Sequence, residues 1–358
     1  MNAEAYEYDG RIERAATPPA SWYTDGRVLE EEQRRVFGRT WQLAGRAEQA
    51  AQPGQFFTTE VGGEPVIVVR DAGGHLRAFS NVCRHRAGPV ASGAGSCERF
   101  RCGYHGWTYA LDGTLLSARE FDGVERFRCE EHSLPEFRAE AWGALVFVNL
   151  DAQAAPLAET LEDIPTLTRG RDWASMLPAA RKEWEVECNW KTYVDNYLEG
   201  YHIPGIHPAL HRELDYARYR TETRRLHSMQ HAPLRPSASR IAAAGEGEPG
   251  ALYFWVFPNL MLNVYADNYS TNLIIPLGPE RTLTVFEWYF RDPDAPETRE
   301  RIGRTIELSD EIQLEDMRIC ETVQAGLRSR TYTRGRYSVR RENGVHHFHG
   351  LLAEFMGR

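Results

Sequence analysis

The stretch from Asn189 to His207 reads NWKTYVDNYLEGYHIPGIH and brings several metal-binding types of side chain together. Asp195, Glu199, His202 and His207 lie within thirteen positions, among aromatic and apolar residues. Two imidazoles with a nearby carboxylate suit a divalent transition metal. The alternative is a helix whose polar side chains are buried and hydrogen-bonded, because an acid is costly to bury without a partner.

The local geometry of this stretch follows from its periodicity. Apolar residues recur at three- and four-residue steps over residues 188–201, which predicts a helix. Asp195, Glu199 and His202 then lie on one helical face. The proline and glycine that follow are expected to end the helix, so that His207 returns toward His202 from a turn. Two histidines and one carboxylate with open positions form the ligand set of non-haem iron(II) sites.

Length and composition describe an ordinary soluble chain. Its 358 residues are enough for two domains, and 42% hydrophobic with 26% charged residues is typical of globular proteins. The net charge of −9 is spread without blocks of one sign, so neither nucleic acid nor an anionic membrane is an expected partner. No signal peptide or membrane span is expected, and six cysteines in a chain of this length favour a reducing cytoplasm.

The hydrophobic pattern of the sequence changes along the chain. Residues 1–39 predict a helical lead-in that packs on the second domain. From about residue 40, short β-type runs alternate with glycine turns, which predicts hairpins, and this pattern continues through ALVFVNL at residues 144–150. A linker containing prolines and acids follows. We therefore expect a first domain over residues 40–150 and a second over residues 151–358.

The first domain contains a second metal motif. It reads Cys83-Arg-His85 and, after sixteen residues, Cys102-Gly-Tyr-His105-Gly-Trp. Two thiolates and two imidazoles can hold zinc. A Cys-x-His pair matched with a Cys-x-x-His pair suits better a [2Fe–2S] cluster in which two cysteines hold one iron and two histidines hold the other. The remaining cysteines have no such pairing and are expected to pack in the core.

With both motifs in this order, the chain resembles the Rieske non-haem iron oxygenases, specifically their α (oxygenase) subunits. The resemblance covers nearly the whole chain and rests on the two cluster pairs, on the Asn-Trp-Lys run and on EGYHIPGIH. It implies an α+β fold, with a Rieske [2Fe–2S] β domain beside a helix-grip catalytic domain. In the latter, an antiparallel sheet curls around a long helix. Residues 250–290 fit as its strands and residues 297–328 as the helix.

The resemblance also assigns cofactor ligands. The cluster ligands that it implies are Cys83, His85, Cys102 and His105. For the mononuclear iron(II) it implies His202, His207 and, from LEDMRICETVQ in the predicted long helix, Asp316. Glu315 is the alternative ligand, and a surface role for both acids is a further possibility.

Glu199 and Asp195 are candidate catalytic residues in a supporting role. Glu199 is three residues before His202 and is expected to accept a hydrogen bond from the second nitrogen of that ring, which would fix its tautomer. In the family, the matching acid also bridges to a cluster-ligating histidine of a neighbouring subunit. The resemblance therefore implies a homotrimer in which Glu199 contacts His85 or His105 of another chain.

The sequence of the second domain resembles those of the choline, carnitine and betaine monooxygenase branch of the family. Ring-hydroxylating dioxygenases commonly have Asp three residues before the first iron histidine, whereas this chain has Glu199, as in the quaternary ammonium oxygenases. Aromatic residues can cage a methylated ammonium, although core packing is the alternative role for them. Residues 233–250 predict a loop that is either a lid or a plain linker. The cage candidates are Tyr193, Tyr197, Tyr201, Trp255, Tyr265 and Tyr269.

The implied function is that of a terminal oxygenase acting on a small molecule. The sequence lacks a dinucleotide-binding fingerprint and a plant-type four-cysteine pattern, so a separate NAD(P)H-dependent flavin/iron–sulfur reductase is expected to deliver electrons. O2 is the co-substrate, and the expected substrate is a quaternary ammonium compound hydroxylated at a C–H bond. The alternatives are an aromatic-ring-hydroxylating or O/N-demethylating Rieske oxygenase, a non-catalytic Rieske electron carrier, and a helix-grip ligand-binding protein with structural zinc.

Overall fold

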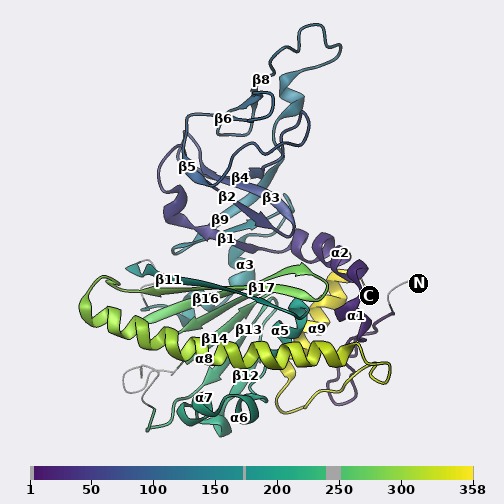
Figure 1. Cartoon of the computed structure of the whole chain (residues 1–358), viewed down its shortest axis with the longest axis vertical. Helices are drawn as coiled ribbons and strands as arrows, with labels where there is room; N and C mark the ends of the chain where they lie inside the picture. Colours follow the sequence, from purple (N-terminus) through teal and green to yellow (C-terminus); the bar gives the residue numbers. More distant parts are fainter. Residues whose placement is uncertain (1–3, 172–174, 239–250, 358) are drawn as a thin grey trace. The chain divides into compact units, whose positions relative to one another are not determined.

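The computed structural model describes residues 4–171, 175–238 and 251–357, and Figure 1 shows the course of the chain. The chain divides into two compact units. We call Phe37–Leu157 the β unit, and Met1–Val36 with Ala158–Arg358 the helix–sheet unit. None of the described helices is long and apolar enough to cross a membrane.

Two antiparallel sheets make up the β unit. The large sheet has the order β1-β10-β9-β4-β3-β2-β5 and the small one the order β6-β7-β8. The strands are β1 (Gln42–Arg46), β2 (Gln55–Val61), β3 (Glu64–Arg70), β4 (Leu76–Ser80), β5 (Ala94–Ser96), β6 (Phe100–Arg101), β7 (Thr108–Tyr109), β8 (Leu115–Ser117), β9 (Glu136–Trp142) and β10 (Leu145–Asn149). Short 3-10 helices are η1 (Phe37–Arg39), η2 (Ala47–Ala50) and η3 (Cys129–His132).

The hairpin signals of the first domain are confirmed. Strands β2 and β3 are joined by Gly62 and Gly63, which have φ of 58° and 84° and form the two-residue type of turn that needs left-handed residues. Side chains alternate along β3, so Val66 and Val68 enter one hydrophobic cluster, whereas Ile67 and Val69 enter another on the opposite face. Strand β3 is therefore buried on both faces, which explains its continuous apolar run.

The helix–sheet unit is a seven-stranded antiparallel sheet with helices. The strand order is β11-β17-β16-β15-β14-β13-β12. The strands are β11 (Leu177–Val186), β12 (Arg220–Thr223), β13 (His227–Ala232), β14 (Ala251–Val256), β15 (Leu260–Val264), β16 (Asn268–Gly278) and β17 (Arg281–Phe290). The helices are α1 (Ser21–Thr24), α2 (Gly26–Arg35), α3 (Leu157–Leu161), α4 (Ile164–Leu167), α5 (Trp190–Tyr197), α6 (Ile203–Ile206), α7 (Pro208–Glu213), η5 (Tyr216–Arg218), α8 (Pro296–Leu327) and α9 (Asn343–Met356).

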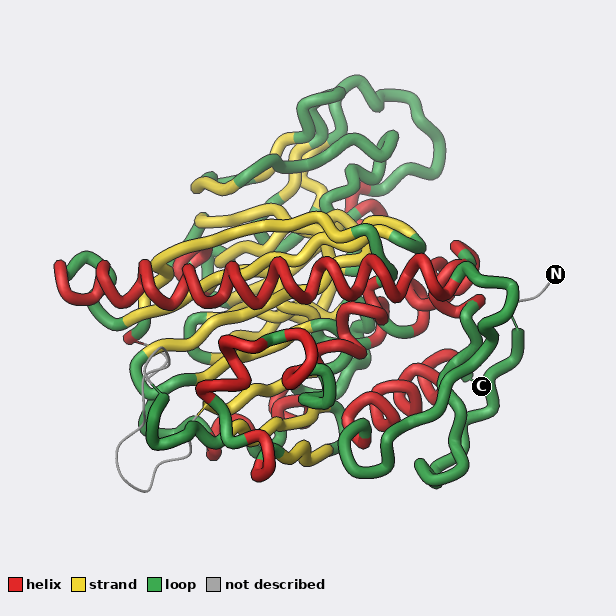
Figure 2. Tube along the Cα trace, turned by 60° about the horizontal axis from the view of Figure 1, so that its bottom comes forward, coloured by secondary structure: helices red, strands yellow, loops and turns green. Residues whose placement is uncertain are grey.

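The long helix α8 lies along the sheet, as both views show (Figures 1 and 2). Ile302 and Ile306 pack against Phe286 and Trp288 of β17. Beyond Ile306, the contact of α8 with the sheet includes a buried amide as well as apolar residues. The Gln313 side chain donates to Thr284 Oγ1 at 3.1 Å. The predicted antiparallel sheet with one long helix is confirmed.

Helix α5 is shorter than the helix predicted over residues 188–201. It begins after Asn189, whose side chain caps it by accepting the N–H of Lys191 at 3.0 Å. It ends at Tyr197, and the chain then turns at Gly200. A Cβ at Gly200 would lie 2.6 Å from the ring of Tyr219, so only glycine fits this close approach.

The role predicted for the proline and glycine of this stretch was also wrong. Pro204 and Gly205 do not end a helix; they lie within the short helix α6. Proline is tolerated there because the first turn of a helix needs no hydrogen bond from its N–H. His202 precedes α6 and His207 follows it. The loop predicted over residues 233–250 falls largely on residues 239–250, which lie outside the described residues.

Candidate metal centres and substrate cavity

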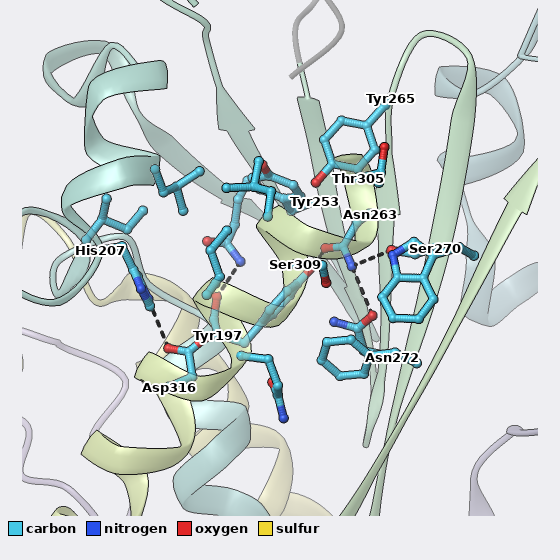
Figure 3. Close-up of a pocket in the computed structure, with 18 of the residues that line it drawn as sticks. Tyr197, His207, Tyr253, Asn263, Tyr265, Ser270, Asn272, Thr305, Ser309 and Asp316 are labelled. Atoms are coloured by element: carbon cyan, nitrogen blue, oxygen red, sulfur yellow. Dashed lines mark hydrogen bonds and ion pairs between the residues drawn. The ribbon is translucent and has the colours of Figure 1, made fainter. Parts of the chain in front are cut away.

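His202, His207 and Asp316 meet in the helix–sheet unit. Their metal-binding atoms all lie within 4.8 Å of one another. Asp316 Oδ1 is 3.0 Å from Nε2 of His207 and 3.8 Å from Nε2 of His202 (Figure 3). Both rings therefore turn the same nitrogen toward one carboxylate, so the three side chains can bind a single ion between them.

Each imidazole of this site is held at its other nitrogen by a carboxylate. Nδ1 of His202 is 2.7 Å from Glu199 Oε1, and Nδ1 of His207 is 2.7 Å from Glu315 Oε2. A carboxylate at Nδ1 keeps the proton there and leaves Nε2 free, which is the tautomer that binds a metal. The chemistry of this donor set therefore fits a divalent iron, and Glu315 contacts the His207 ring at Nδ1, on the side away from Asp316.

The carboxylate of Asp316 is fixed from α5. Asn196 Nδ2 donates to Asp316 Oδ1 at 2.6 Å. Burial lowers the pKa of His207, but hydrogen bonds to Asp316 and then Glu315, with their charges, outweigh it, so the pKa of His207 is raised. A site that attracts positive charge in this way suits a cation.

The predicted contact between Glu199 and His202 is present, but its geometry differs from the prediction. Both residues lie in the turn between α5 and α6, not on one helical face. Glu199 Oε2 accepts the backbone N–H groups of Tyr201 and His202, the latter at 3.1 Å, while Oε1 contacts the ring. The turn itself therefore orients the carboxylate.

Asp195 lies apart from these residues. Its Oδ2 accepts the hydroxyl of Tyr23 at 2.8 Å, and its Oδ1 is 2.9 Å from His349 Nε2. His349 Nδ1 in turn is 2.7 Å from the hydroxyl of Tyr337. Asp195 does not line the cavity described next. This arrangement ties α5 to α1 and α9, which favours a structural role for Asp195 over the catalytic role predicted for it.

A cavity of about 440 Å³ adjoins the three metal-binding residues. Of the predicted cage residues, Tyr193, Tyr197 and Tyr265 line it, whereas Tyr201 is 56% exposed. Trp255 and Tyr269 are buried elsewhere and do not line it. The sequence interpretation missed four further aromatic residues of the wall, Tyr219, Tyr253, Phe286 and Trp288. The alternation of Phe286 and Trp288 along β17, on one face of the strand, is a signal that pointed to two of them.

Amides of β15 and β16 form the polar part of the wall. Tyr197 donates to Asn263 Oδ1 at 3.0 Å, and Asn263 Nδ2 donates to Ser270 Oγ at 3.1 Å and to Asn272 Oδ1 at 3.2 Å (Figure 3). With its oxygen engaged in this way, Asn272 has its amide nitrogen left to contact a ligand. The cavity thus combines aromatic faces with a hydrogen-bond donor.

The two arginines that line the cavity are both paired with acids. Arg301 Nη1 is 2.8 Å from Asp267, and Arg304 is 3.6 Å from Glu300. Arg301 is fifteen residues before Asp316 on α8, which corresponds to a rise of about 22 Å along the helix. The positive charges of the wall are therefore neutralised and lie far from the metal-binding end.

In the β unit, Cys83 and Cys102 begin two loops with the same hydrogen-bond pattern. In each loop the cysteine donates its N–H to the carbonyl five residues later and accepts the N–H of the residue four later, over 2.8–3.0 Å. The residue at that fourth position, Ala87 or Gly106, has a positive φ of 56° or 75°. Two equivalent loops therefore present their side chains in equivalent ways.

The four predicted cluster residues come together at these loops. Both cysteines are buried, while His85 is half-buried and His105 is exposed, and the two ring centroids are 4.6 Å apart. Backbone N–H groups of Tyr104 and His105 donate to the Cys102 thiol, although burial, the larger effect, raises the pKa of that thiol. Buried sulfurs with N–H donors and imidazoles at the surface fit a [2Fe–2S] cluster with its histidine-bound iron outermost.

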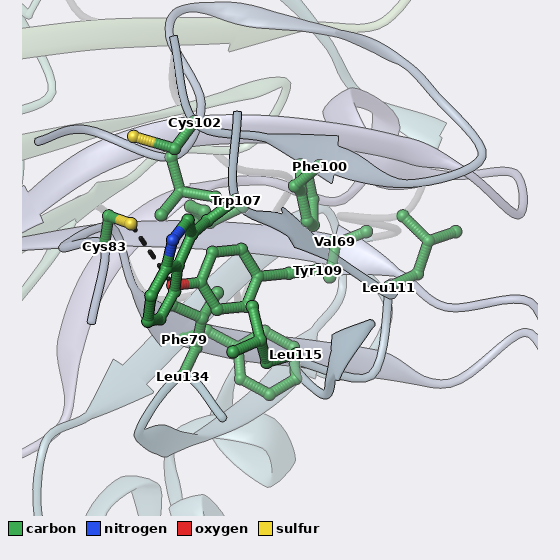
Figure 4. Packing of buried hydrophobic residues seen from close by; sticks show 12 residues of the cluster. Val69, Phe79, Cys83, Phe100, Cys102, Trp107, Tyr109, Leu111, Leu115 and Leu134 are labelled. Carbon is green, nitrogen blue, oxygen red and sulfur yellow. Dashed lines mark hydrogen bonds between the residues drawn. The ribbon is translucent and has the colours of Figure 1, made fainter. Parts of the chain in front are cut away.

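The cysteine loops rest on a hydrophobic cluster (Figure 4). Trp107 and Tyr109, both almost fully buried, lie at its centre. The Tyr109 hydroxyl is 3.2 Å from Cys83 Sγ and accepts the N–H of Arg84 at 3.0 Å. Tyr109 therefore joins the loop of Cys83 to the core, a contact that the motif itself did not predict.

Replacing His105 with cysteine is expected to lower the potential of the cluster by roughly 100–300 mV in the fraction that still assembles, because a thiolate replaces a neutral ligand. Redox potentiometry of the full chain measures this. His75→Cys, at an exposed histidine of the same unit, is the control and is expected to leave the potential unchanged. An unshifted potential in the His105 variant would remove His105 from the ligand set.

Comparisons with known proteins agree with these two sites. Residues 40–129 match the Rieske [2Fe-2S] domain family, and residues 173–358 match the ring hydroxylating alpha subunit (catalytic domain) family. The chloroplastic choline monooxygenase of Arabidopsis thaliana is 38% identical over 97% of this chain and 85% of that protein. The carnitine monooxygenase oxygenase subunit of Escherichia coli (strain K12) is 32% identical over 96% of this chain and 94% of that protein.

A solved structure extends the likeness to the whole fold. The quaternary ammonium Rieske monooxygenase CntA in complex with its substrate L-carnitine superposes with a TM-score of 0.84 at 28% identity, over 99% of this chain and 100% of that one. The match of the second domain argues against a non-catalytic electron carrier, and that of the first against a zinc-binding protein. The chain therefore belongs to the Rieske non-haem iron oxygenases, as an oxygenase (α) subunit whose cofactors are a Rieske [2Fe–2S] cluster and a mononuclear iron.

Proposed function

We propose that this chain hydroxylates a small quaternary ammonium compound of the choline, betaine or carnitine type at a C–H bond. A separate NAD(P)H-dependent flavin/iron–sulfur reductase supplies the electrons. The observation that carries the proposal is the pair of histidines and one aspartate at the end of a cavity with aromatic walls and no unpaired arginine among its described lining residues. The relatives named for choline and carnitine oxidation support the substrate class.

Within this proposal, two sets of residues hold the cofactors. When bound, the cluster supplies electrons one at a time, and the iron(II) binds and activates O2. Glu199 and Glu315 hold the Nδ1 protons of the two iron-binding histidines, and Asn196 holds the carboxylate of Asp316. The cluster ligands are Cys83, His85, Cys102 and His105, and the iron ligands are His202, His207 and Asp316.

The cavity recognises the substrate through both parts of its wall. A trimethylammonium group is attracted to the negative faces of aromatic rings, and each such contact is worth about 0.5–2 kcal/mol. Tyr193 and Tyr197 of α5 flank Asn196, which holds Asp316, whereas Trp288 packs on Ile302 and Ile306 toward the other end of the cavity. The amide nitrogen of Asn272 donates to an oxygen of the substrate. A volume of about 440 Å³ is at the small end of the range for ligand sites and suits a compact ligand.

We further propose that the enzyme is a homotrimer in which Glu199 contacts a cluster histidine of the neighbouring subunit. The exposure of His105 supports this, because its ring is open to a partner. Glu199 supports it as well, because a carboxylate has about four acceptor positions and can hold two imidazole N–H groups. The location proposed is the cytoplasm, which the six free cysteines support.

In a system reconstituted with a surrogate reductase, choline, betaine or carnitine is expected to raise O2 consumption several-fold. One O2 and one NADH should be consumed for each hydroxylated product, with the second oxygen atom released as water. An oxygen electrode with product analysis measures this, and Asp316→Ala is the blank. Stimulation by simple aromatic acids, with none by the three ammonium compounds, would contradict the proposed substrate class.

A further inference from the structure

Three arginines form a basic pocket on the small sheet of the β unit. The pocket has a volume of about 420 Å³ and opens beside β6, β7 and β8. Arg99, Arg101 and Arg119 are all exposed. The lining contains the hydroxyls of Thr108 and Ser117 but no carboxylate. This concentration of positive charge is a local departure from a chain whose net charge is −9.

The charge of this basic pocket is not neutralised by the protein itself. Within the described part of the chain, none of its three arginines forms an ion pair, whereas Arg77 and Arg138 of the same unit pair with Glu136 and Glu140 at 2.8 and 2.7 Å. Like charges held close together, as Arg101 and Arg119 are at Gly106, repel one another. An acidic partner would relieve this repulsion, so the pocket is suited to binding an anionic surface.

The basic pocket is part of the structure that holds the cluster ligands. Arg101 immediately precedes Cys102, and Gly106 of the lining immediately follows His105. The arginine side chains pack on Gly106, where a Cβ would lie 3.1 Å from Arg119 Cδ and 3.4 Å from Arg101 Nε. A molecule bound in the pocket therefore contacts the loop of Cys102 and His105 directly.

The character of the basic pocket favours a protein as its occupant over a small anion. Leu116 lies in its lining with 52% of its surface exposed, and arginine next to an exposed apolar side chain is typical of protein interfaces. Small-molecule sites enclose most of their ligand, whereas these arginines extend into solvent. Guanidinium groups also bind carboxylates in a bidentate manner, which suits an acidic protein surface.

We propose that the basic pocket is the docking surface for an acidic electron-donor protein, which reaches the cluster loop of Cys102 and His105 there. This inference rests on the proposed function, since a terminal oxygenase without its own reductase must receive electrons from a partner. Opposite charges accelerate encounter at low ionic strength, and this effect weakens as salt screens it. The pocket thus determines how fast electrons arrive, without taking part in substrate binding.

The test uses an Arg101→Glu/Arg119→Glu double variant and an acidic plant-type [2Fe–2S] ferredoxin as the donor. Stopped-flow spectroscopy follows reduction of the Rieske cluster in the full-length enzyme. The second-order rate constant is expected to fall about 10-fold or more at low ionic strength, and this difference should shrink as salt is added. Reduction by dithionite should be unchanged. The milder Arg101→Gln/Arg119→Gln variant should have a ferredoxin rate constant between those of wild type and the double glutamate variant.

A matched control separates local charge from total charge. Arg39→Glu/Arg126→Glu changes the net charge by the same amount at exposed arginines outside the basic pocket, and it should keep the wild-type rate. If wild type and the Arg101→Glu/Arg119→Glu variant are reduced by the ferredoxin with the same rate constant, whether that constant is large or small, the proposal is overturned. Loss of the oligomer on size exclusion in that variant would also overturn it, since the arginines would then serve subunit contact.

A small-anion role is also distinguishable. Saturable binding of inorganic phosphate that the Arg101/Arg119 variant loses, together with an unchanged ferredoxin rate, would assign the basic pocket to a small anion and overturn the docking role. None of these readouts depends on substrate turnover. A failure of the proposed ammonium substrate therefore leaves the result intact, and a failure of docking leaves the substrate assignment intact.

Discussion

Asp316→Ala is expected to lose the mononuclear iron and at least about 100-fold of turnover, while the visible absorbance of the cluster remains. Among the residues that the structure describes, Asp316 is the one carboxylate within 4 Å of the Nε2 atoms of both His202 and His207. Without it, two neutral imidazoles are left to hold the ion. The cluster residues lie in the β unit and Asp316 in the helix–sheet unit, so cluster assembly should be unaffected.

Metal analysis of anaerobically purified protein measures this result. Wild type should contain about three irons per chain and the variant about two. Glu315→Ala is the matched control at the adjacent residue, because Glu315 contacts His207 Nδ1 instead of facing the ion. It should weaken iron binding by about 10–100-fold without abolishing it. If Glu315→Ala loses iron completely while Asp316→Ala keeps iron and turnover, the ligand assignment is wrong by one residue.

Glu199→Gln is expected to separate the two metal centres functionally while leaving both filled. The glutamine keeps the shape of the side chain but loses the charge that holds imidazole N–H donors on His202 and, in the proposed trimer, on a cluster histidine of the neighbouring subunit. The cluster should still be reduced by the partner protein. Its reoxidation by O2 in the presence of substrate should slow by about 10–100-fold or more.

Stopped-flow reoxidation of the pre-reduced cluster is the measurement for Glu199→Gln. Glu315→Gln is the matched control, because it alters the equivalent carboxylate on His207, which has no proposed link to a cluster. Protein loaded with iron should then reoxidise normally in Glu315→Gln and slowly in Glu199→Gln. A wild-type reoxidation rate in Glu199→Gln would show that this carboxylate only supports the turn between α5 and α6.

Much of the metal chemistry was predictable from the sequence because its parts are close together in the chain. Each cluster pair lies within one short loop, and such a loop forms from local hydrogen bonds and a left-handed residue at Ala87 or Gly106. The same holds for Glu199 and His202, which meet within one turn. Hairpins such as the one at Gly62 and Gly63 follow from turn chemistry and side-chain alternation.

Contacts between distant segments were decided by tertiary packing. Lys191 pairs with Glu32 at 2.7 Å with both side chains fully buried, and burial raises the pKa of Glu32 and lowers that of Lys191. No local pattern indicates that pair. Asp195 looked like a member of the metal site because it is one turn from Glu199, but α5 ends between the two residues and Asp195 faces α1 and α9.

The sequence by itself indicated the two cluster pairs and the histidines of the second motif, because short-range spacing and turn chemistry specify local geometry. Its resemblance to the family implied the α+β fold and the Asp316 ligand. The tertiary structure alone showed that Glu315 contacts Nδ1 of His207 while Asp316 contacts Nε2, and which aromatic residues line the cavity. Those outcomes depend on how α8 and the sheet pack, and the helical period brings both Glu315 and Asp316 near that face. Only the position of His207, more than a hundred residues away in the chain, distinguishes them.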